Sequence, residues 1–222
     1  MITKRLVYIH VFRTGGYMVQ GVLRKVPGLV MVSDRPTEHL TYAQMTTVCA
    51  QQRMSRPLAA VFVRNPFDWY VSMWCWVNTA PNVPSFPSFR AYLGAIDERR
   101  FGITGTGRNY SRFTDHWKDM GADSAKWTGR FERLQEDFVA IMLEAMPELV
   151  NEKMLRRLIV KEPIHHPSRH PQTGKHPGAY QQYYDAETRA LVEGWDGALL
   201  ERFGYNFEGE EADDEDLSHT GA

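Results

Sequence analysis

The stretch that decides the fold is "VYIHVFRTGG" at residues 7–16, followed at once by "YMVQGVLRKV" at residues 17–26. The run "RLVYIHV" (5–11) is almost continuously apolar, which is typical of a strand buried on both faces of a parallel sheet. After Gly15 and Gly16, apolar residues recur at helical spacing, at Met18, Val19, Val22, Leu23 and Val26. Paired glycines between a strand and a helix let backbone N–H groups approach an anion closely. The stretch therefore predicts an anion-binding turn at the edge of an α/β sheet.

This turn differs from the loop by which most nucleoside triphosphates are held. That loop ends in Gly-Lys-Ser/Thr after a longer glycine spacing, and the ending is absent here. Arg13 adds a fixed cation, while consecutive amides and the helix N-terminus add partial positive charge. The alternative is a plain Gly-Gly turn with an exposed arginine. We predict an anionic ligand that is held differently from ATP.

The rest of the chain alternates strands with helices. "GLVMVS" (28–33), "PLAAVFV" (57–63) and "AKWTGRF" (125–131) are further strand candidates. Thr41 with Gln44 forms a capping-box pattern for a helix over 42–54, and Asp185 caps a final helix that ends at Gly204. This order predicts one α/β domain over residues 1–207, a three-layer sandwich with a central, mostly parallel sheet. Ligands of such sheets bind outside the carboxyl ends of the strands.

Charge is distributed unevenly along the chain. The net charge is −1, but "EGEEADDEDLSHTGA" (208–222) contains seven acidic residues and no Lys or Arg. We expect this tail to be disordered. The body keeps 20 acidic residues against 26 basic ones, an excess that suits an anionic ligand.

Several classes of protein are disfavoured by the composition. No apolar run approaches the roughly 18 residues of a membrane helix, and the N-terminus lacks the pattern of a signal peptide. Cys49 and Cys75 both lie in apolar surroundings, which predicts buried thiols rather than a disulfide. We expect a cytoplasmic protein with neither a membrane nor a nucleic acid as its partner.

A second cationic pattern is "VFVRNPFDWYVS" (61–72). Arg64 directly follows a buried strand, and Ser72 comes eight residues later on a helix that Asn65 and Pro66 can begin. Both side chains reach one anion only if the chain turns sharply at Asn65. Otherwise Arg64 is an ordinary surface residue.

These segments together resemble the sulfotransferases that use 3′-phosphoadenosine 5′-phosphosulfate (PAPS), especially the carbohydrate type and the small bacterial kind. "YIHVFRTGG" is similar to their 5′-phosphosulfate loop, and "FVRNPFDWYVS" to their 3′-phosphate motif. "WTGRFERLQEDF" and "YYDAETRALVEGWDGALLERFGY" resemble two later family segments, in the same order. The likeness runs from about residue 6 to residue 207. It departs at Phe12, where Pro is usual, at Arg13, where Lys is usual, and at Tyr17, where Thr or Ser is usual.

The resemblance implies a P-loop-like sulfotransferase fold and a reaction that leaves adenosine 3′,5′-bisphosphate (PAP). Arg13 would neutralise charge on the departing phosphate oxygen, so no metal is needed. The implied nucleotide-binding residues are Arg13, Thr14, Gly15, Gly16, Tyr17, Arg64, Ser72 and Lys175. Lys175, in "TGKHPGAY", could equally be a solvated lysine.

Sulfuryl transfer to a hydroxyl also needs a base, and a neutral histidine suits this role near neutral pH. Among eight histidines, His39 follows the second predicted strand and precedes the Thr41 cap, which favours an uncharged imidazole. The resemblance also places a base after this strand. Glu38 is the runner-up, and His10 is expected to be a packed structural residue. The spacing of His165, His166, His170 and His176 in the second loop could suggest a metal, but no Cys or helical His pair accompanies them, so we expect no metal site there.

The acceptor is the open question. Acceptor choice would lie in the loop at 79–109, which we expect to contain at most a short helix near "FRAYLGAI" (89–96), and in the loop at 163–180. Phe86 and Phe89 of the first loop are candidates for stacking on the acceptor. A carbohydrate hydroxyl is one candidate acceptor. Two other functions remain: a non-catalytic nucleotide-binding protein with the same fold, and a small-molecule kinase. The oligomeric state is not indicated.

Overall fold

The computed structural model describes residues 1–32, 39–55, 58–79, 85–98, 112–162 and 179–209. These residues form two compact units, each made of two separate stretches of chain. The first unit comprises Met1–Arg64 and Asp115–Pro167, and the second comprises Asn65–Thr114 and Ser168–Ala222. The single domain over 1–207 stays a prediction, and the acidic tail from residue 210 lies outside the described residues.

The first unit contains a parallel sheet of three strands in the order β1-β2-β3. The strands are β1 (Leu6–Ile9), β2 (Leu58–Val63) and β3 (Trp127–Arg130). Ile9 pairs with Val61, and Val63 pairs with Arg130, so the three carboxyl ends meet at one edge. All four residues of β1 and five of the six in β2 are buried, as the apolar runs predicted. This edge is where the sequence placed the ligand.

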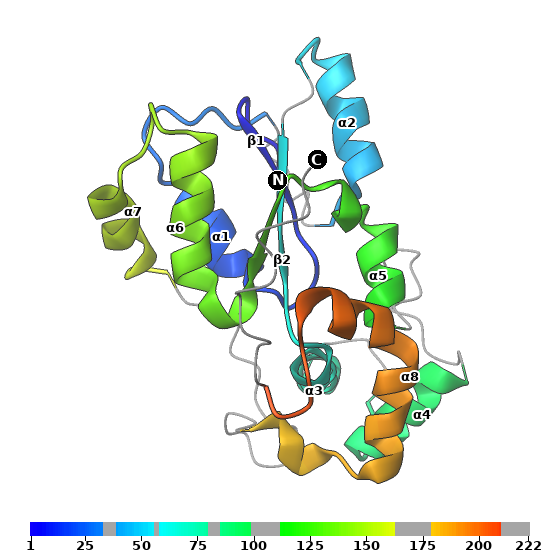
Figure 1. Cartoon of the computed structure of the whole chain (residues 1–222). Coiled ribbons are helices and arrows are strands. Elements are labelled where there is room, and N and C mark those ends of the chain that lie inside the picture. Colours follow the sequence, from blue (N-terminus) through cyan, green and yellow to red (C-terminus); the bar gives the residue numbers. More distant parts are fainter. Residues whose placement is uncertain (33–38, 56–57, 80–84, 99–111, 163–178, 210–222) are drawn as a thin grey trace. The chain divides into compact units, whose positions relative to one another are not determined.

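Helices cover both faces of this sheet (Figure 1). The helices α1 (Gly16–Leu23), α6 (Leu134–Ala145) and α7 (Glu152–Ile159) lie on one side. The helix α2 (Tyr42–Gln51) and α5 (Phe113–Asp119), of which residues 115–119 belong to this unit, lie on the other. Two 3-10 turns, η1 (Ala122–Ser124) and η2 (Phe131–Arg133), flank β3. The three-layer α/β architecture expected from the sequence is confirmed.

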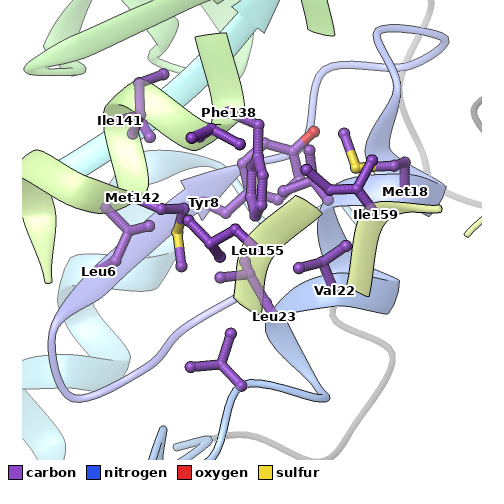
Figure 2. Packing of buried hydrophobic residues seen from close by; sticks show 14 of the residues in the cluster. Leu6, Tyr8, Met18, Val22, Leu23, Phe138, Ile141, Met142, Leu155 and Ile159 are labelled. Carbon is purple, nitrogen blue, oxygen red and sulfur yellow. The ribbon is translucent and has the colours of Figure 1, made fainter. Parts of the chain in front are cut away.

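Alternate residues of β1 point into the core between the sheet and its first helical layer (Figure 2). Leu6 and Tyr8 pack there against side chains of the covering helices, namely Met18, Val22, Leu23, Phe138, Met142, Leu155 and Ile159. Burial of each large apolar side chain contributes roughly 1.5–3 kcal/mol. Burial also raises the pKa of the Tyr8 hydroxyl, which therefore stays protonated. The core holds β1, and with it the start of the glycine turn, in a fixed position.

The predicted strand over 28–33 does not form in the parallel sheet. Met31 instead makes an isolated antiparallel bridge to Thr3, supported by the Lys4 N–H to Val30 carbonyl bond at 3.2 Å. Val30 is 50% exposed, so this short apolar run lacks the two-sided burial of an inner strand. Over the described residues 28–32, the prediction of a second strand in the main sheet is therefore wrong.

The second unit contains the helices α3, α4 and α8. Their bounds are α3 (Pro66–Val77), α4 (Phe89–Asp97) and α8 (Ala186–Phe203), with a 3-10 turn η3 (Tyr180–Tyr183). As predicted, the Asn65 side chain accepts from the Phe67 N–H at the start of α3. Asp185 and Thr188 form a capping box on α8, which ends at Gly204 with φ 62°. The helices α5 and α7 are not expected from the sequence pattern.

A buried carboxylate ties three segments of the second unit together. Asp196 of α8 is 0% exposed, and it accepts from the Tyr70 hydroxyl at 2.7 Å and from the Thr114 N–H at 2.7 Å. The Tyr70 oxygen in turn accepts from the Phe113 N–H at 3.0 Å. Burial, and then the negative charge of Asp196, raise the pKa of Tyr70 well above its ordinary value, so the phenol remains a donor. These hydrogen bonds replace the water that the Asp196 carboxylate and the Tyr70 hydroxyl lose on burial.

The structure bears on two questions raised by the composition: the state of the cysteines and the presence of a membrane-spanning helix. Cys49 in α2 and Cys75 in α3 are both buried and free, as predicted. Among the described helices, none combines the length and the apolar character that a membrane span requires.

Candidate functional site

The turn after β1 has left-handed backbone on both sides of Thr14. Arg13 has φ 62° and Gly15 has φ 87°, so two left-handed residues flank Thr14. The Thr14 side chain is fully buried and donates to the Val11 carbonyl at 2.9 Å, which closes the turn. Within the described residues, the backbone N–H groups of Thr14, Gly15 and Gly16 donate to no protein acceptor. Amides in this arrangement, at the N-terminus of α1, are suited to an anion.

His10 lies directly against this turn. It follows the last residue of β1, is 8% exposed, and its Nδ1 lies 3.1 Å from the Gln20 amide nitrogen. Because an amide nitrogen only donates, Nδ1 is the acceptor. A Cβ atom at Gly16 would overlap the His10 ring, so only glycine fits between α1 and this imidazole. His10 is thus a packed residue, as predicted, and it explains the second glycine of the pair.

We predict that Gly16→Ala lowers the free energy of unfolding by about 1–3 kcal/mol, the usual cost of overpacking a core. Gly197→Ala is the matched control, because a Cβ atom at that α8 position meets nothing within 4 Å. In the control, alanine should be neutral or should add up to about 1 kcal/mol through helix propensity. Urea unfolding of the two variants checks this. Equal stability of both variants would contradict the close fit at Gly16.

Arg64 joins the end of β2 to the turn. It is 8% exposed, and its Nη1 donates to the Arg13 carbonyl at 2.9 Å. The guanidinium carbon lies 4.1 Å from the centre of the Phe131 ring, just past β3. A planar guanidinium can stack and donate at once, which an ammonium cannot do. Arg64 therefore links the carboxyl ends of all three strands and is a buried residue, not an ordinary surface arginine.

The end of β3 is shaped by the segment "TGRFE". A Cβ atom at Gly129 would overlap the Phe62 ring, so glycine is needed for β3 to lie beside β2. The Arg130 N–H donates to the Asp137 carboxylate at 2.7 Å, and Asp137 also lies 3.6 Å from Arg133. These contacts fix the turn that carries Phe131.

A group of aromatic and imidazole rings surrounds Phe12, one residue before Arg13. The Phe12 ring stacks on His39 with 3.7 Å between ring centres and an angle of 22°. His10 lies 5.0 Å from His39, and His116 of α5 lies 5.4 Å from Phe12. The Phe12 N–H donates to His116 Nε2 at 3.1 Å. The structure thus brings His39 to the turn, where the sequence analysis had proposed a base.

The other proposed site residues are exposed, lie in the second unit, or lie outside the described residues. Tyr17, in the first turn of α1, is 56% exposed. Ser72 lies on α3 in the second unit and is 5% exposed, whereas Arg64 ends the first unit, so their joint binding of one phosphate stays a prediction. Glu38, Lys175 and the histidines of the 163–178 segment lie outside the described residues.

The two acceptor candidates, Phe86 and Phe89, do not both lie in a loop. Phe89 is not a loop residue but the first residue of α4, and it is only 4% exposed. Its ring packs 4.8 Å from Tyr184 and 5.8 Å from Trp74. Phe89 is therefore a core residue of the second unit, because the segment read as a loop contains a helix whose apolar face needs covering. Phe86 is half-buried, 5.5 Å from Tyr92.

His116 contacts Phe12 and Phe131 contacts Arg64, and the sequence predicts neither contact. His116 lies 104 residues from its hydrogen-bond partner, and "FTDHWKDM" has no motif that marks it. Phe131 belongs to a segment that was quoted only for its resemblance. The position of Phe131 directly after a strand is a usable signal, because a residue there meets its neighbours at the edge where the parallel strands end. For metals, no group of three or more His, Cys, Asp or Glu side chains among the described residues could hold an ion.

Comparison with known proteins establishes the fold of this chain. No family model and no curated protein matches the chain. Among solved structures, the chain is similar to mouse sulfotransferase SULT7A1 in complex with PAP, at 18% sequence identity and with a TM-score of 0.55. The likeness covers 92% of this chain and 84% of the mouse chain. This protein therefore has the sulfotransferase fold, an α/β fold whose three parallel strands are flanked by helices.

Proposed function

We propose that the protein is a cytoplasmic sulfotransferase that moves a sulfuryl group from PAPS to an acceptor hydroxyl and releases PAP. One observation carries the proposal: the Arg64 guanidinium reaches the carbonyl of Arg13 at 2.9 Å. The Arg64 guanidinium thereby lies beside the backbone of Arg13, in a glycine turn whose amides, within the described part of the chain, donate to no protein acceptor. A nucleotide with phosphates at both its 5′ and 3′ positions would match this edge, with the Arg13 side chain as the second cation.

The residues of the turn have separate tasks in this reaction. Sulfuryl transfer, like phosphoryl transfer, depends on positioning and on stabilising the charge of a loose transition state. The Thr14–Gly16 amides would hold the 5′-phosphosulfate, and Arg13 would neutralise the departing phosphate oxygen. Arg64 and Ser72 would bind the 3′-phosphate. Tyr17 is exposed enough for its hydroxyl to meet the donor, and Lys175 would add a further cation.

His39 is the proposed base. Its stacking on Phe12 holds an imidazole next to the residue that precedes Arg13. A base in this position would take the proton of the acceptor hydroxyl as the oxygen attacks sulfur. The PAP bound to the mouse protein supports the choice of donor. Arg13 supplies the positive charge that a metal would otherwise supply, so we propose a metal-free reaction with a carbohydrate hydroxyl as one acceptor.

The proposal is tested with labelled PAPS and a panel of sugar and phenol acceptors, together with calorimetry of PAP binding. We expect tight PAP binding and transfer to at least one hydroxyl class. Tight binding without transfer across the panel would favour a non-catalytic nucleotide-binding protein. A larger thermal shift with Mg-ATP than with PAP would favour a kinase.

Arg64→Ala should weaken PAP binding by about 1.5–3 kcal/mol, the range for a hydrogen bond to a charged group. Arg64→Lys should lose part of this affinity, because an ammonium keeps the charge but not the planar fork over Phe131. Arg5→Ala is the matched control, since Arg5 lies at the opposite end of β1 in an exposed ion pair with Glu148. Calorimetry giving the same affinity for Arg64→Ala and Arg5→Ala would remove Arg64 from the binding site.

A further inference from the structure

The candidate base and the glycine turn are joined through one residue, Phe12. Its ring stacks on His39 at 3.7 Å between ring centres, and its N–H donates to His116 Nε2 at 3.1 Å. Phe12 therefore contacts the proposed base through its side chain and α5 through its backbone. It also directly precedes Arg13, whose left-handed backbone begins the turn.

The hydrogen bond determines the form of the His116 ring. A ring nitrogen that accepts an N–H bond carries no proton, so in the neutral imidazole the proton lies on Nδ1. His116 is 1% exposed, and its Phe12 bond spans 104 residues of sequence. Loss of the acceptor would leave the Phe12 N–H without a partner where water has little access. The bond thus fixes the approach to the turn from the α5 side.

Proline at position 12 could not make this arrangement. Proline has no N–H to donate and no aromatic ring to stack. The motif that this stretch resembles has proline there, so the chain's own phenylalanine and the buried acceptor His116 form a matched pair. The Phe12–His116 pair therefore gives a structural reason for phenylalanine at the position where the similar motif has proline.

We propose that Phe12 and His116 are positioning residues of the site: His116 holds the turn through the Phe12 N–H, and the Phe12 ring orients His39. The proposal rests on the proposed function for its effect on catalysis, although the hydrogen bond itself can be tested without it. The His116 hydrogen bond and the Phe12 ring act on different steps. Loss of the His116 bond should loosen the turn and weaken PAP binding, whereas loss of the ring should lower kcat.

A double-mutant cycle separates the two contributions. His116→Leu should weaken PAP binding by roughly 5- to 150-fold, which corresponds to the cost of an unsatisfied buried donor. In a Phe12→Pro background, where no donor exists, the same change should weaken binding less than about 2-fold. In a Phe12→Leu background, which keeps the N–H, the full effect should return. His116→Gln, which offers a side-chain oxygen as acceptor, should recover part of the affinity.

The ring is tested by Phe12→Leu alone. We expect kcat to fall while the PAP dissociation constant stays within about 2-fold, since the N–H to His116 is kept. Lys118→Leu is the control for α5, because Lys118 is exposed two residues beyond His116. Equal losses in kcat for Phe12→Leu and Lys118→Leu would overturn the role of the ring.

The closing experiment measures the bond in the free protein, by a long-range 1H–15N spectrum of His116 and by the same cycle read as unfolding free energy. We expect a proton on Nδ1 and a positive coupling between positions 12 and 116. A proton on Nε2, or equal effects of His116→Leu in the native and the Phe12→Pro backgrounds, would overturn the proposal. These readouts need neither PAPS nor an acceptor. A coupled pair in a protein that binds no PAP would refute the proposed function while leaving the bond intact.

Discussion

His39→Ala is expected to lower kcat by about 10²–10⁴-fold, the usual contribution of a general base, with PAP affinity nearly unchanged. The imidazole stacks on Phe12 beside the glycine turn, whereas the proposed nucleotide contacts come from the turn itself and from Arg64. Removal of the ring therefore affects proton transfer more than nucleotide binding. Single-turnover transfer and calorimetry on the same preparation separate the two quantities.

His39→Phe is the matched variant for this prediction. It keeps an aromatic ring on Phe12 but has no ring nitrogen, so it should be as slow as His39→Ala if proton transfer is the role of His39. Recovery of activity in His39→Phe would mean that the ring serves only for packing. Full activity of His39→Ala would assign the base to another residue, with Glu38 next in order.

Asp196→Ala is expected to lower the free energy of unfolding by about 3–5 kcal/mol. Two donors, the buried Tyr70 hydroxyl and the part-buried Thr114 N–H, would lose their acceptor at about 1–3 kcal/mol each, and a cavity would remain. Asp196 is fully buried, so water does not replace the lost bonds. Urea unfolding followed by tryptophan fluorescence measures the change, because Trp69 and Trp195 lie 5.0 and 5.8 Å from the Tyr70 ring.

Two further variants separate hydrogen bonding from charge. Asp196→Asn keeps one oxygen for the Thr114 N–H and can donate to the Tyr70 oxygen, so we expect a loss of about 1 kcal/mol. Tyr70→Phe removes the acceptor of the Phe113 N–H and should cost about 1–3 kcal/mol. A loss below about 1 kcal/mol for Asp196→Ala would contradict the network. An equal loss for alanine and asparagine would mean that the charge, not the hydrogen bonds, matters.

Local signals in the sequence were reliable where a short segment determines its own structure. The Thr41 and Asp185 capping boxes and the Asn65 cap form as predicted, because each satisfies N–H groups within a few residues. The buried strands β1 and β2 follow from continuous apolar runs. The Gly15 left-handed turn follows from the strand–glycine–helix order.

The same local signals do not identify contacts between residues that are distant in the sequence. Residues 28–33 have the apolar pattern of a strand, but whether such a segment joins the sheet depends on which neighbour covers its second face. Phe89 looks like a loop residue after three prolines, yet Ser88 caps a helix there and the Phe89 ring is buried. The burial of the Phe89 ring and the pairing of Met31 with Thr3 are both tertiary contacts, which the local pattern does not specify.

By itself, the sequence determined that a buried strand ends in a glycine turn before a helix, that an arginine follows a second buried strand, and that the fold is α/β. These results depend on periodicity, on glycine at positive φ and on parallel strands ending at one edge. Only the tertiary structure decided that Arg64 donates to the Arg13 carbonyl, that Phe12 stacks on His39, and that His116 accepts the Phe12 N–H. Such contacts join residues 27 to 104 positions apart, and their geometry is set by the packing of whole helices onto the sheet rather than by any local motif.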